Sequence, residues 1–416
     1  MTTPAPPSAS PSSSALRRCV ALLVALLASA LVVAGCSSSG GGNEGNGGGD
    51  PTTSPSPAGP KLTVTPAANA TAVPPVTPIS LSIDKDTITA VSVKSDDGDE
   101  VKGAVGADKR SWASTGKLSF GATYTVSVTT TGSATPLTSK FSTVPTPSGD
   151  SSVRTSSILG DGKTYGVGMP IILKLSRSVK SDAARAKFEK MLKVTSNPTT
   201  TGAWGWISST ELHFRPAEYW AAGSTVHVEV DTAGRAIADG VWGRTDLTVD
   251  FKIGAKREVI ADSATHTMKV LEDDEVVKSM PISLGKPKFP SSSGTMVIID
   301  KRREAMFDSS TYGLAVDSPD GYRTKVEYPM RLTWGGEFIH SAPWSVADQG
   351  KRNVSHGCLN VGPDNAVWLY NRLQVGDPVT VKNTETRVEL GNGYSEWSLS
   401  FTEWLTHSKG GVVTTG

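Results

Sequence analysis

Apolar and polar residues alternate with a period of two over many short stretches of the chain after residue 78. Residues 124–128 (YTVSV) and 226–230 (VHVEV) are clear examples. Because successive side chains of a strand point to opposite faces, this pattern predicts half-buried β-strands. Turn-forming clusters such as residues 95–99 (SDDGD) separate these stretches. The chain is therefore expected to be mainly β.

The first strands fall into two groups, and we expect two immunoglobulin-like β-sandwich domains, over residues 79–148 and 149–254. The two segments look like copies, because three large apolar residues recur at a common offset. They are Trp112, Leu118 and Phe120 in the first segment and Trp206, Leu212 and Phe214 in the second. Spacers and sugar-binding modules are both possible roles. Neither segment shows a cluster of aromatic and polar residues, which favours rigid spacers.

The second segment also contains a predicted helix. Ser181 is a good N-cap residue, and Ala184, Phe188 and Leu192 follow at helical spacing. His213 and His227 fall within the alternating patterns, so we interpret both as ordinary sheet residues.

A third β-rich region predicts a separate domain over residues 255–383, with strands near 257–259, 267–271 and 276–282. It contains a long segment, residues 300–332, rich in Ser, Tyr and Pro. Loops of this length inside a compact domain are usually functional lids.

The third region ends with helical signals and an apolar tail. Residues 363–373 begin with Pro and are followed by Gly376, which predicts a short helix. The tail, residues 384–416, carries Trp397 and Trp404. It is too apolar for a free terminus, so we expect it to dock on the preceding domains.

The N-terminal residues 1–35 have the features of a lipoprotein signal peptide. Arg17 and Arg18 precede an apolar stretch, and small residues precede Cys36. Lipidation of Cys36 would anchor the chain at the outer face of the cytoplasmic membrane. An uncleaved anchor and an ordinary secretory signal are the alternatives. Residues 36–78 are rich in Gly, Ser, Pro and Thr and predict a flexible linker.

The charge of the chain mainly excludes one class of partner. The formal net charge is +1, and removal of a signal segment with two arginines makes the chain about neutral. No basic stripe or run is present, so we expect no nucleic-acid partner.

The candidate chemistry lies in residues 353–360 (NVSHGCLN). If residues 1–35 are removed and Cys36 is lipidated, Cys358 is the one remaining thiol among three cysteines, which favours a reactive role. A nucleophilic thiol needs a base, and His340 and His356 lie nearby in the sequence. In a strand, His356 and Cys358 would share one face. Gly357 would let a substrate approach and would free backbone N–H groups as an oxyanion hole.

Zinc is the competing interpretation of this cluster, because His340, His356 and Cys358 are all ligand types. Neither CxxC nor HExxH spacing is present, so we expect no metal.

These residues resemble the signature of the L,D-transpeptidases with a YkuD-type catalytic domain. The resemblance rests on His340 and on residues 355–360 (SHGCLN), and extends to residues 306–313, 337–344 and 350–353. The chain is similar in particular to the actinobacterial lipoprotein members of this family. The resemblance implies two immunoglobulin-like domains followed by a β-rich catalytic domain, with a short helix after the nucleophile.

The resemblance also implies an activity, which is the cross-linking of peptidoglycan stem peptides. A tetrapeptide donor would lose its terminal D-alanine, and an amine acceptor would resolve the thioester. Residues 300–332 would form a hairpin-like flap over the active site. The expected substrate-binding residues are Met306, Tyr312, Tyr322, Trp344, Ser355 and Asn360. For some of them, ordinary packing of the flap or loop is the alternative. Carbapenem β-lactams would bind covalently.

We therefore expect Cys358 as nucleophile and His340 as its base, with Ser341 orienting His340. Backbone N–H groups around His356, Gly357 and Cys358 are the expected oxyanion donors. His356 remains a rival base. No cofactor is expected, because the cleaved amide supplies the energy. The alternatives are an L,D-carboxypeptidase-like cysteine peptidase and a non-catalytic wall-binding lipoprotein.

Overall fold

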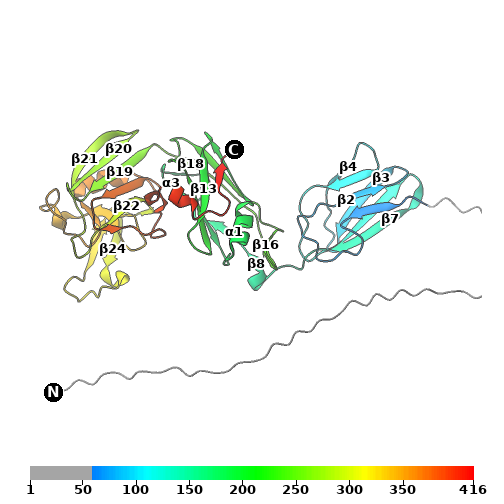
Figure 1. Ribbon diagram of the computed structural model, residues 1–416, viewed down its shortest axis with the longest axis horizontal. Helices are drawn as coiled ribbons and strands as arrows, with labels where there is room; N and C mark the ends of the chain where they lie inside the picture. The colour runs from blue at the N-terminus through cyan, green and yellow to red at the C-terminus, as the bar shows by residue number, and fades with distance from the viewer. Residues whose placement is uncertain (1–58) are drawn as a thin grey trace, which may run out of the picture. The chain divides into compact units, whose positions relative to one another are not determined.

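The computed structural model describes residues 59–416 (Figure 1). The expected signal segment, Cys36 and the first part of the expected linker lie outside the described residues. None of the described helices is long and apolar enough to cross a membrane.

The first sandwich combines a four-stranded and a three-stranded sheet. The larger has the order β1-β2-β5-β4, with bounds Leu62–Thr65, Ser80–Ile83, Ser111–Ser114 and Gly103–Val105. The smaller has the order β3-β6-β7, with bounds Ile88–Ser95, Thr123–Thr130 and Ser133–Ser142. Both sheets contribute to one core, which includes Trp112, Val126 and Phe141. Strand β1 lies in the expected linker and pairs with β2, so that part of the linker is folded.

The second sandwich has two main sheets and one small sheet. One has the order β10-β18-β15-β12, with bounds Lys163–Tyr165, Leu247–Ile253, Thr225–Val230 and Leu192–Asn197. The other has the order β31-β13-β14-β11-β9, with bounds Val412–Thr414, Thr201–Trp206, Glu211–Pro216, Ile171–Leu175 and Thr155–Ser157. The small sheet has the order β16-β17-β8, with bounds Ala236–Ala238, Val241–Gly243 and Ser152–Val153. The 3₁₀ turn η1 (Gly149–Ser151) precedes it.

The predicted helix forms as α1 (Asp182–Glu189), with the Ser181 hydroxyl accepting the Ala184 N–H at 3.2 Å. Leu192, expected on the same helix, instead begins strand β12. The expected repeat is also wrong. Trp206 lies in β13 and Leu212 in β14, whereas Leu118 lies between β5 and β6. Equal spacing in the sequence therefore places these residues on different elements.

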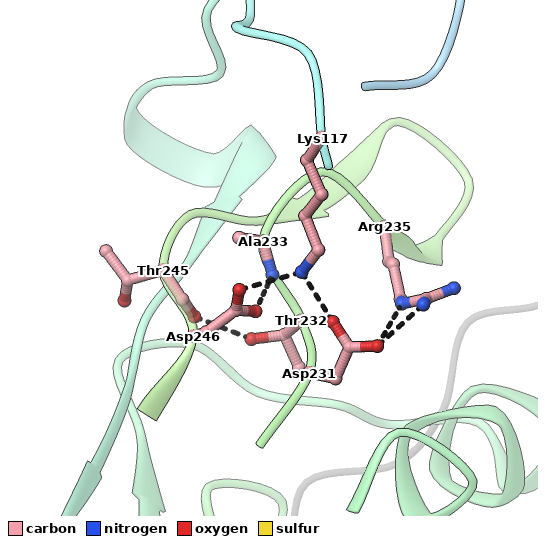
Figure 2. Close-up of polar contacts among 7 residues, drawn as sticks. All are labelled: Lys117, Asp231, Thr232, Ala233, Arg235, Thr245 and Asp246. Atoms are coloured by element: carbon pink, nitrogen blue, oxygen red, sulfur yellow. Dashed lines mark hydrogen bonds and ion pairs between the residues drawn. The ribbon is translucent and has the colours of Figure 1, made fainter. Parts of the chain in front are cut away.

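Lys117 joins the first sandwich to the second (Figure 2). Its Nζ contacts Asp231 Oδ1 at 2.5 Å and Asp246 Oδ2 at 2.7 Å. Arg235 also pairs with Asp231, at 2.6 Å, and Asp246 accepts the Ala233 N–H at 2.8 Å. Both carboxylates are thus held by their own domain before they meet Lys117.

The third region is built on a ten-stranded sheet with the order β23-β26-β27-β28-β21-β20-β19-β29-β22-β30. In that order the bounds are Asp300–Lys301, Met330–Arg331, Phe338–Ser341, Leu359–Val361, Glu275–Ser283, Thr267–Glu272, Arg257–Asp262, Pro378–Lys382, Ser292–Val297 and Thr386–Arg387. Helix α2 (Pro363–Arg372) follows β28 and buries Ala366 and Leu369. The predicted helix thus has Pro at its first position.

The expected flap is a hairpin of β24 (Glu304–Asp308) and β25 (Arg323–Glu327), with the turn η2 (Ser309–Tyr312) after β24. We call residues 304–327 the flap. Figure 1 shows the β24 hairpin projecting from the body of the domain. The remaining 3₁₀ turn of this region, η3, spans Pro343–Ser345.

The tail, residues 384–416, adds a strand to the second sandwich. It contains η4 (Glu396–Ser398), α3 (Phe401–Leu405) and β31, which pairs with β13. The buried Trp404 donates its indole N–H to the Ala203 carbonyl at 3.0 Å. The Glu189 carboxylate accepts the N–H groups of Lys409 at 2.9 Å and of Gly410 at 2.5 Å.

Candidate active site

Two parallel strands bring the predicted site residues together. In the register of β27 and β28, His340 lies opposite Asn360 and Ile339 opposite Leu359. Cys358 immediately precedes β28 and lies two residues before Asn360, the partner of His340. The side chains of Cys358 and His340 line one cavity of about 390 Å³. The full lining is Phe307, Tyr322, Thr324, Val326, His340, Trp344, Val354, Ser355, His356, Cys358 and Asn360.

His340 is buried and held by its own strand. Its Nδ1 lies 2.8 Å from the carbonyl oxygen of Ser341, so Nδ1 carries the proton and donates it. Nε2 is then the nitrogen with a free lone pair. Burial lowers the pKa of His340 to about 4. Ser341 thus orients His340 through its backbone carbonyl. The rings of Phe307 and Trp344 pack on the imidazole at centroid distances of 5.3 and 5.8 Å.

Cys358 is equally enclosed, with 7% of its surface exposed. Its thiol donates to the Gly336 carbonyl at 3.6 Å. Burial raises the pKa of the Cys358 thiol to about 12. The resting pair is therefore a neutral thiol and a neutral imidazole, not a thiolate with an imidazolium.

The segment before Cys358 is a loop, so the shared face that a strand would give His356 and Cys358 does not arise. The Ser355 hydroxyl donates to the Cys358 carbonyl at 2.6 Å and accepts the Gly357 N–H at 3.1 Å. Gly357 has a φ of 115°, which side chains strongly disfavour. Asn360 donates to the Ser345 hydroxyl at 3.1 Å. The Gly357 N–H, one of the expected oxyanion donors, is thus already engaged inside the loop.

His356 lies between two aromatic rings. Phe289 is 4.9 Å and Tyr322 is 5.3 Å from its ring, centroid to centroid. Its Nε2 is 3.7 Å from Asp320 Oδ1. Burial, together with the charge of Lys286, holds the pKa of His356 below its ordinary value. His356 and Tyr322 also line a second cavity, of about 310 Å³, so they separate the two cavities.

Comparison with known proteins decides the family. The chain matches the bacterial Ig domain family over residues 70–236 and the L,D-transpeptidase catalytic domain family over residues 256–381. L,D-transpeptidase 2 of Mycobacterium tuberculosis (strain CDC 1551 / Oshkosh) is 36% identical over 83% of this chain and 84% of its own length. The chain belongs to the L,D-transpeptidases. It is an enzyme with an immunoglobulin-like region before a YkuD catalytic domain.

Other L,D-transpeptidases are also similar to this chain. L,D-transpeptidase 5 of M. tuberculosis (strain ATCC 25618 / H37Rv) is 30% identical over 85% of this chain and 78% of its own length. A crystal structure is known of L,D-transpeptidase 3 from M. tuberculosis in complex with a faropenem-derived adduct, and the sequence of its chain is 33% identical to this chain. It covers 55% of this chain and 97% of its own, with a TM-score of 0.47.

The flap of this L,D-transpeptidase differs from expectation by one position. Met306, expected to line the substrate channel, is 56% exposed and lines neither cavity. Its neighbour Phe307 is buried in the cavity that contains Cys358 and His340, which is called the catalytic cavity below after its proposed role. Alternate residues of β24 face opposite sides, so one step in register exchanges the two side chains. The backbone of Tyr312 ends η2, and its side chain lies outside the described part of the structure.

Trp344 lines the catalytic cavity and is 57% exposed, so it lies at the rim. The transpeptidase cavity also includes residues that we did not anticipate, namely Phe307, Thr324, Val326 and Val354. Phe307 lies on β24, and Thr324 and Val326 lie on β25. The sequence does not show which face of these strands looks inward, because that depends on the hairpin register. No group of three or more His, Cys, Asp or Glu side chains within residues 59–416 is arranged to hold a metal ion.

Proposed function

We propose that this L,D-transpeptidase cross-links peptidoglycan stem peptides through a thioester on Cys358. The observation that carries the proposal is the pairing of a buried thiol with a neutral imidazole in one cavity, with Nδ1 of His340 fixed by Ser341. Nε2 is then the nitrogen that can take the thiol proton. Such a set of nucleophile, base and orienting group is the usual arrangement for covalent acyl transfer.

In the first step, Cys358 Sγ attacks the carbonyl carbon between the third residue of a tetrapeptide stem and its terminal D-alanine. His340 Nε2 takes the thiol proton as the S–C bond forms. The C–N bond then breaks, and the imidazolium returns the proton to the departing D-alanine amine. A thioester between the stem and Cys358 remains.

In the second step, the side-chain amine of another stem's third residue attacks the thioester. The C–N bond forms, the C–S bond breaks, and the proton lost by the amine returns through His340 to the sulfur. The product joins two third-position diamino acids. Among the expected oxyanion donors, the Cys358 N–H is a better candidate than the Gly357 N–H, which Ser355 already uses.

The same chemistry makes β-lactams covalent inhibitors. A carbapenem presents a strained amide carbonyl to Cys358, and ring opening leaves the amine attached to the acyl group. The tethered amine blocks the acceptor, so the thioester should persist. We expect one carbapenem per chain on the peptide that contains Cys358, measured by intact mass and peptide mapping.

The N-terminal sequence supports a further part of the proposal, namely anchoring of the enzyme at the outer face of the cytoplasmic membrane through lipid on Cys36. Mass spectrometry of the N-terminal peptide and membrane fractionation test this point. Recovery of the chain and of a Cys36→Ala variant in equal amounts from the soluble fraction would contradict it.

The direct test of the activity is to incubate purified tetrapeptide muropeptides with the full chain and to analyse the products by mass spectrometry. Cross-linked dimers with loss of D-alanine support transpeptidation. Tripeptides alone would indicate a peptidase in which water resolves the thioester. Absence of both products and of any covalent intermediate would contradict the proposal.

A further inference from the structure

One ion-pair cluster next to the catalytic cavity is not used by the reaction above. Asp320 on the flap lies between two lysines of the loop at residues 285–291. Its Oδ1 is 2.7 Å from Lys286 Nζ and its Oδ2 is 2.6 Å from Lys288 Nζ. Each oxygen of one carboxylate therefore holds its own ammonium group.

This cluster abuts the site itself. Asp320 Oδ1 is 3.7 Å from His356 Nε2, and His356 lines the cavity that contains Cys358. The two lysines lie over the ring of Phe289 at 5.2 and 5.5 Å, and the same ring packs on His356. The ammonium groups are thus one side chain away from the wall of the catalytic cavity.

The charges in the cluster do not balance. Two lysines face one carboxylate, and His356 adds no negative charge. Hydrogen bonds from Lys286 and Lys288 hold the pKa of Asp320 well below its usual range, so this carboxylate is ionised wherever the enzyme works. The flap supplies it, and movement of the flap would leave both ammonium groups without this partner, at the edge of the cavity.

Solvent access makes an exchange of carboxylates feasible. The side chain of Lys286 is 30% exposed, that of Lys288 69% and that of Asp320 20%. Ion pairs with this much solvent contact are weak. An incoming carboxylate that makes the same two contacts can therefore displace Asp320 at little net loss.

We propose that Lys286 and Lys288 form a carboxylate-binding subsite for the donor stem peptide, and that Asp320 is its internal occupant when the flap is closed. The inference rests on the proposed function, because that function makes the donor a peptide with a free carboxylate on the D-alanine next to the cleaved bond. A carboxylate on an internal residue of the stem offers the same chemistry. Binding of either one releases Asp320 and, with it, the flap.

The test compares donors that differ only in this charge. One donor has all carboxylates free, a second is amidated at the terminal D-alanine, and a third is amidated at the internal carboxylate. Thioester formation on the full chain is followed by rapid quench and intact mass, giving KM and kcat for each. The variants are Asp320→Asn and the double variant Lys286→Gln, Lys288→Gln.

Asp320→Asn removes the internal competitor, so KM for the free donor should fall by ~3- to 10-fold, as expected for loss of two partly exposed ion pairs. KM for the donor amidated at the recognised position should not change. The double lysine variant should raise KM for the free donor to the value for that amide. The carboxylate that binds is the one whose amidation makes KM insensitive to both variants.

Glu304→Gln is the matched control. Glu304 forms an exposed ion pair with Lys325 at 2.8 Å within the flap hairpin, so the change removes a flap ion pair elsewhere. It should leave KM for all donors unaltered. Circular dichroism and thermal unfolding check that each variant folds. If the double lysine variant does not fold, the Asp320→Asn result decides alone.

Two results would overturn the subsite. An Asp320→Asn enzyme that changes KM equally for free and amidated donors would show that the cluster is only a flap latch. A wild-type enzyme that forms the thioester but does not discriminate between the donors would also exclude the subsite. Failure of the wild-type enzyme to form a thioester with any donor would count against the proposed function instead, so the two failures are distinguishable.

Discussion

His340 in the catalytic domain and His213 in the second sandwich are both almost completely buried, with 3% and 1% of their surface exposed. His340 has a backbone carbonyl as its hydrogen-bond partner, and burial lowers its pKa to about 4. His213 lies between two carboxylates. Its Nδ1 contacts Glu396 of the tail, and its Nε2 is 2.9 Å from Glu211. Burial alone would lower the pKa of His213, but the two carboxylates raise it.

Both histidines are equally buried, so the difference in their partners decides the direction in which the pKa of each one shifts. A neutral imidazole suits His340 because a base must be able to take a proton. The two carboxylates favour the charged form of His213, and its contact with Glu396 holds the tail on strand β14. The neighbouring Arg215 donates to the Glu396 and Leu399 carbonyls at 2.9 and 2.8 Å, so the tail is fixed at several points.

The largest expected effect concerns the nucleophile beside His340. Cys358→Ala should abolish both thioester formation and dimer production, because no other thiol is present in residues 59–416. The fold should persist, since one sulfur atom is lost from a cavity wall. Muropeptide mass spectrometry and thermal unfolding measure the two properties. Dimers formed at a near-normal rate by this variant would exclude Cys358 as nucleophile.

The next effect separates His340 from its rival, His356. His340→Ala should slow acylation by ~10²- to 10⁴-fold, the usual contribution of general base catalysis. The rate should recover in part as pH rises, because the ionised fraction of Cys358 grows with pH while its pKa of about 12 keeps that fraction small near neutrality. His356→Ala should cause a smaller loss without that recovery, since it removes packing between Phe289 and Tyr322. The reverse pattern in a comparison of pH–rate profiles would assign the role of base to His356.

The sequence indicated most residues of this site but few of the residues and contacts that surround it. The short motif places Ser355, His356 and Cys358 within four residues, and all three line the cavity. His340 joins the site because the parallel strands β27 and β28 are neighbours. The resemblance pointed to Met306, whereas the structure places Phe307 in the cavity. Hairpin register decides which side of β24 faces inward, and residue type does not show that register.

Contacts between distant segments could not be predicted. His213 and Glu396 are 183 residues apart in the sequence, and alternation identifies His213 only as a strand residue. Asp320 likewise looks like an ordinary loop carboxylate until the flap places it on Lys286 and Lys288. Strand β1 was hidden in a segment rich in Pro and Thr, because its partner β2 lies beyond that segment.

A third prediction tests the charged histidine. His213→Gln should lower the free energy of unfolding by ~3–5 kcal/mol, because a buried carboxylate loses its charged partner. The pKa of His213 is raised on folding, so its contribution is complete below the unfolded value of ~6.5 and is lost as pH rises through the folded value. Denaturant unfolding across pH should therefore show the largest gap from wild type under acidic conditions.

His227 provides the matched control for His213. It lies in the same sandwich, on β15, with its Nδ1 2.8 Å from Asp250, but its side chain is 36% exposed. His227→Gln should cost ~1 kcal/mol or less, since exposed ion pairs contribute little. A His213→Gln gap that does not vary with pH would contradict a charged His213.

A fourth prediction tests the neutral histidine by pH alone. His340 acts as a base only when unprotonated, and its pKa is about 4. The rate of carbapenem acylation should therefore stay level as pH falls from neutrality and decline only as pH passes through that value. A decline centred near the ordinary histidine pKa of ~6.5 would mean that His340 is not held neutral by burial.

The smallest expected effect extends the comparison to an exposed ion pair. Lys117 joins the two sandwiches through Asp231 and Asp246 (Figure 2), and the side chains are 32–45% exposed. Lys117→Ala should lower the unfolding free energy by ~1 kcal/mol or less, and salt should remove the difference because exposed charges are screened. Unfolding at low and high salt measures it, with the exposed Lys102→Ala as control. A loss as large as that for His213→Gln, unaffected by salt, would show that solvent exposure does not separate the two kinds of ion pair in this protein.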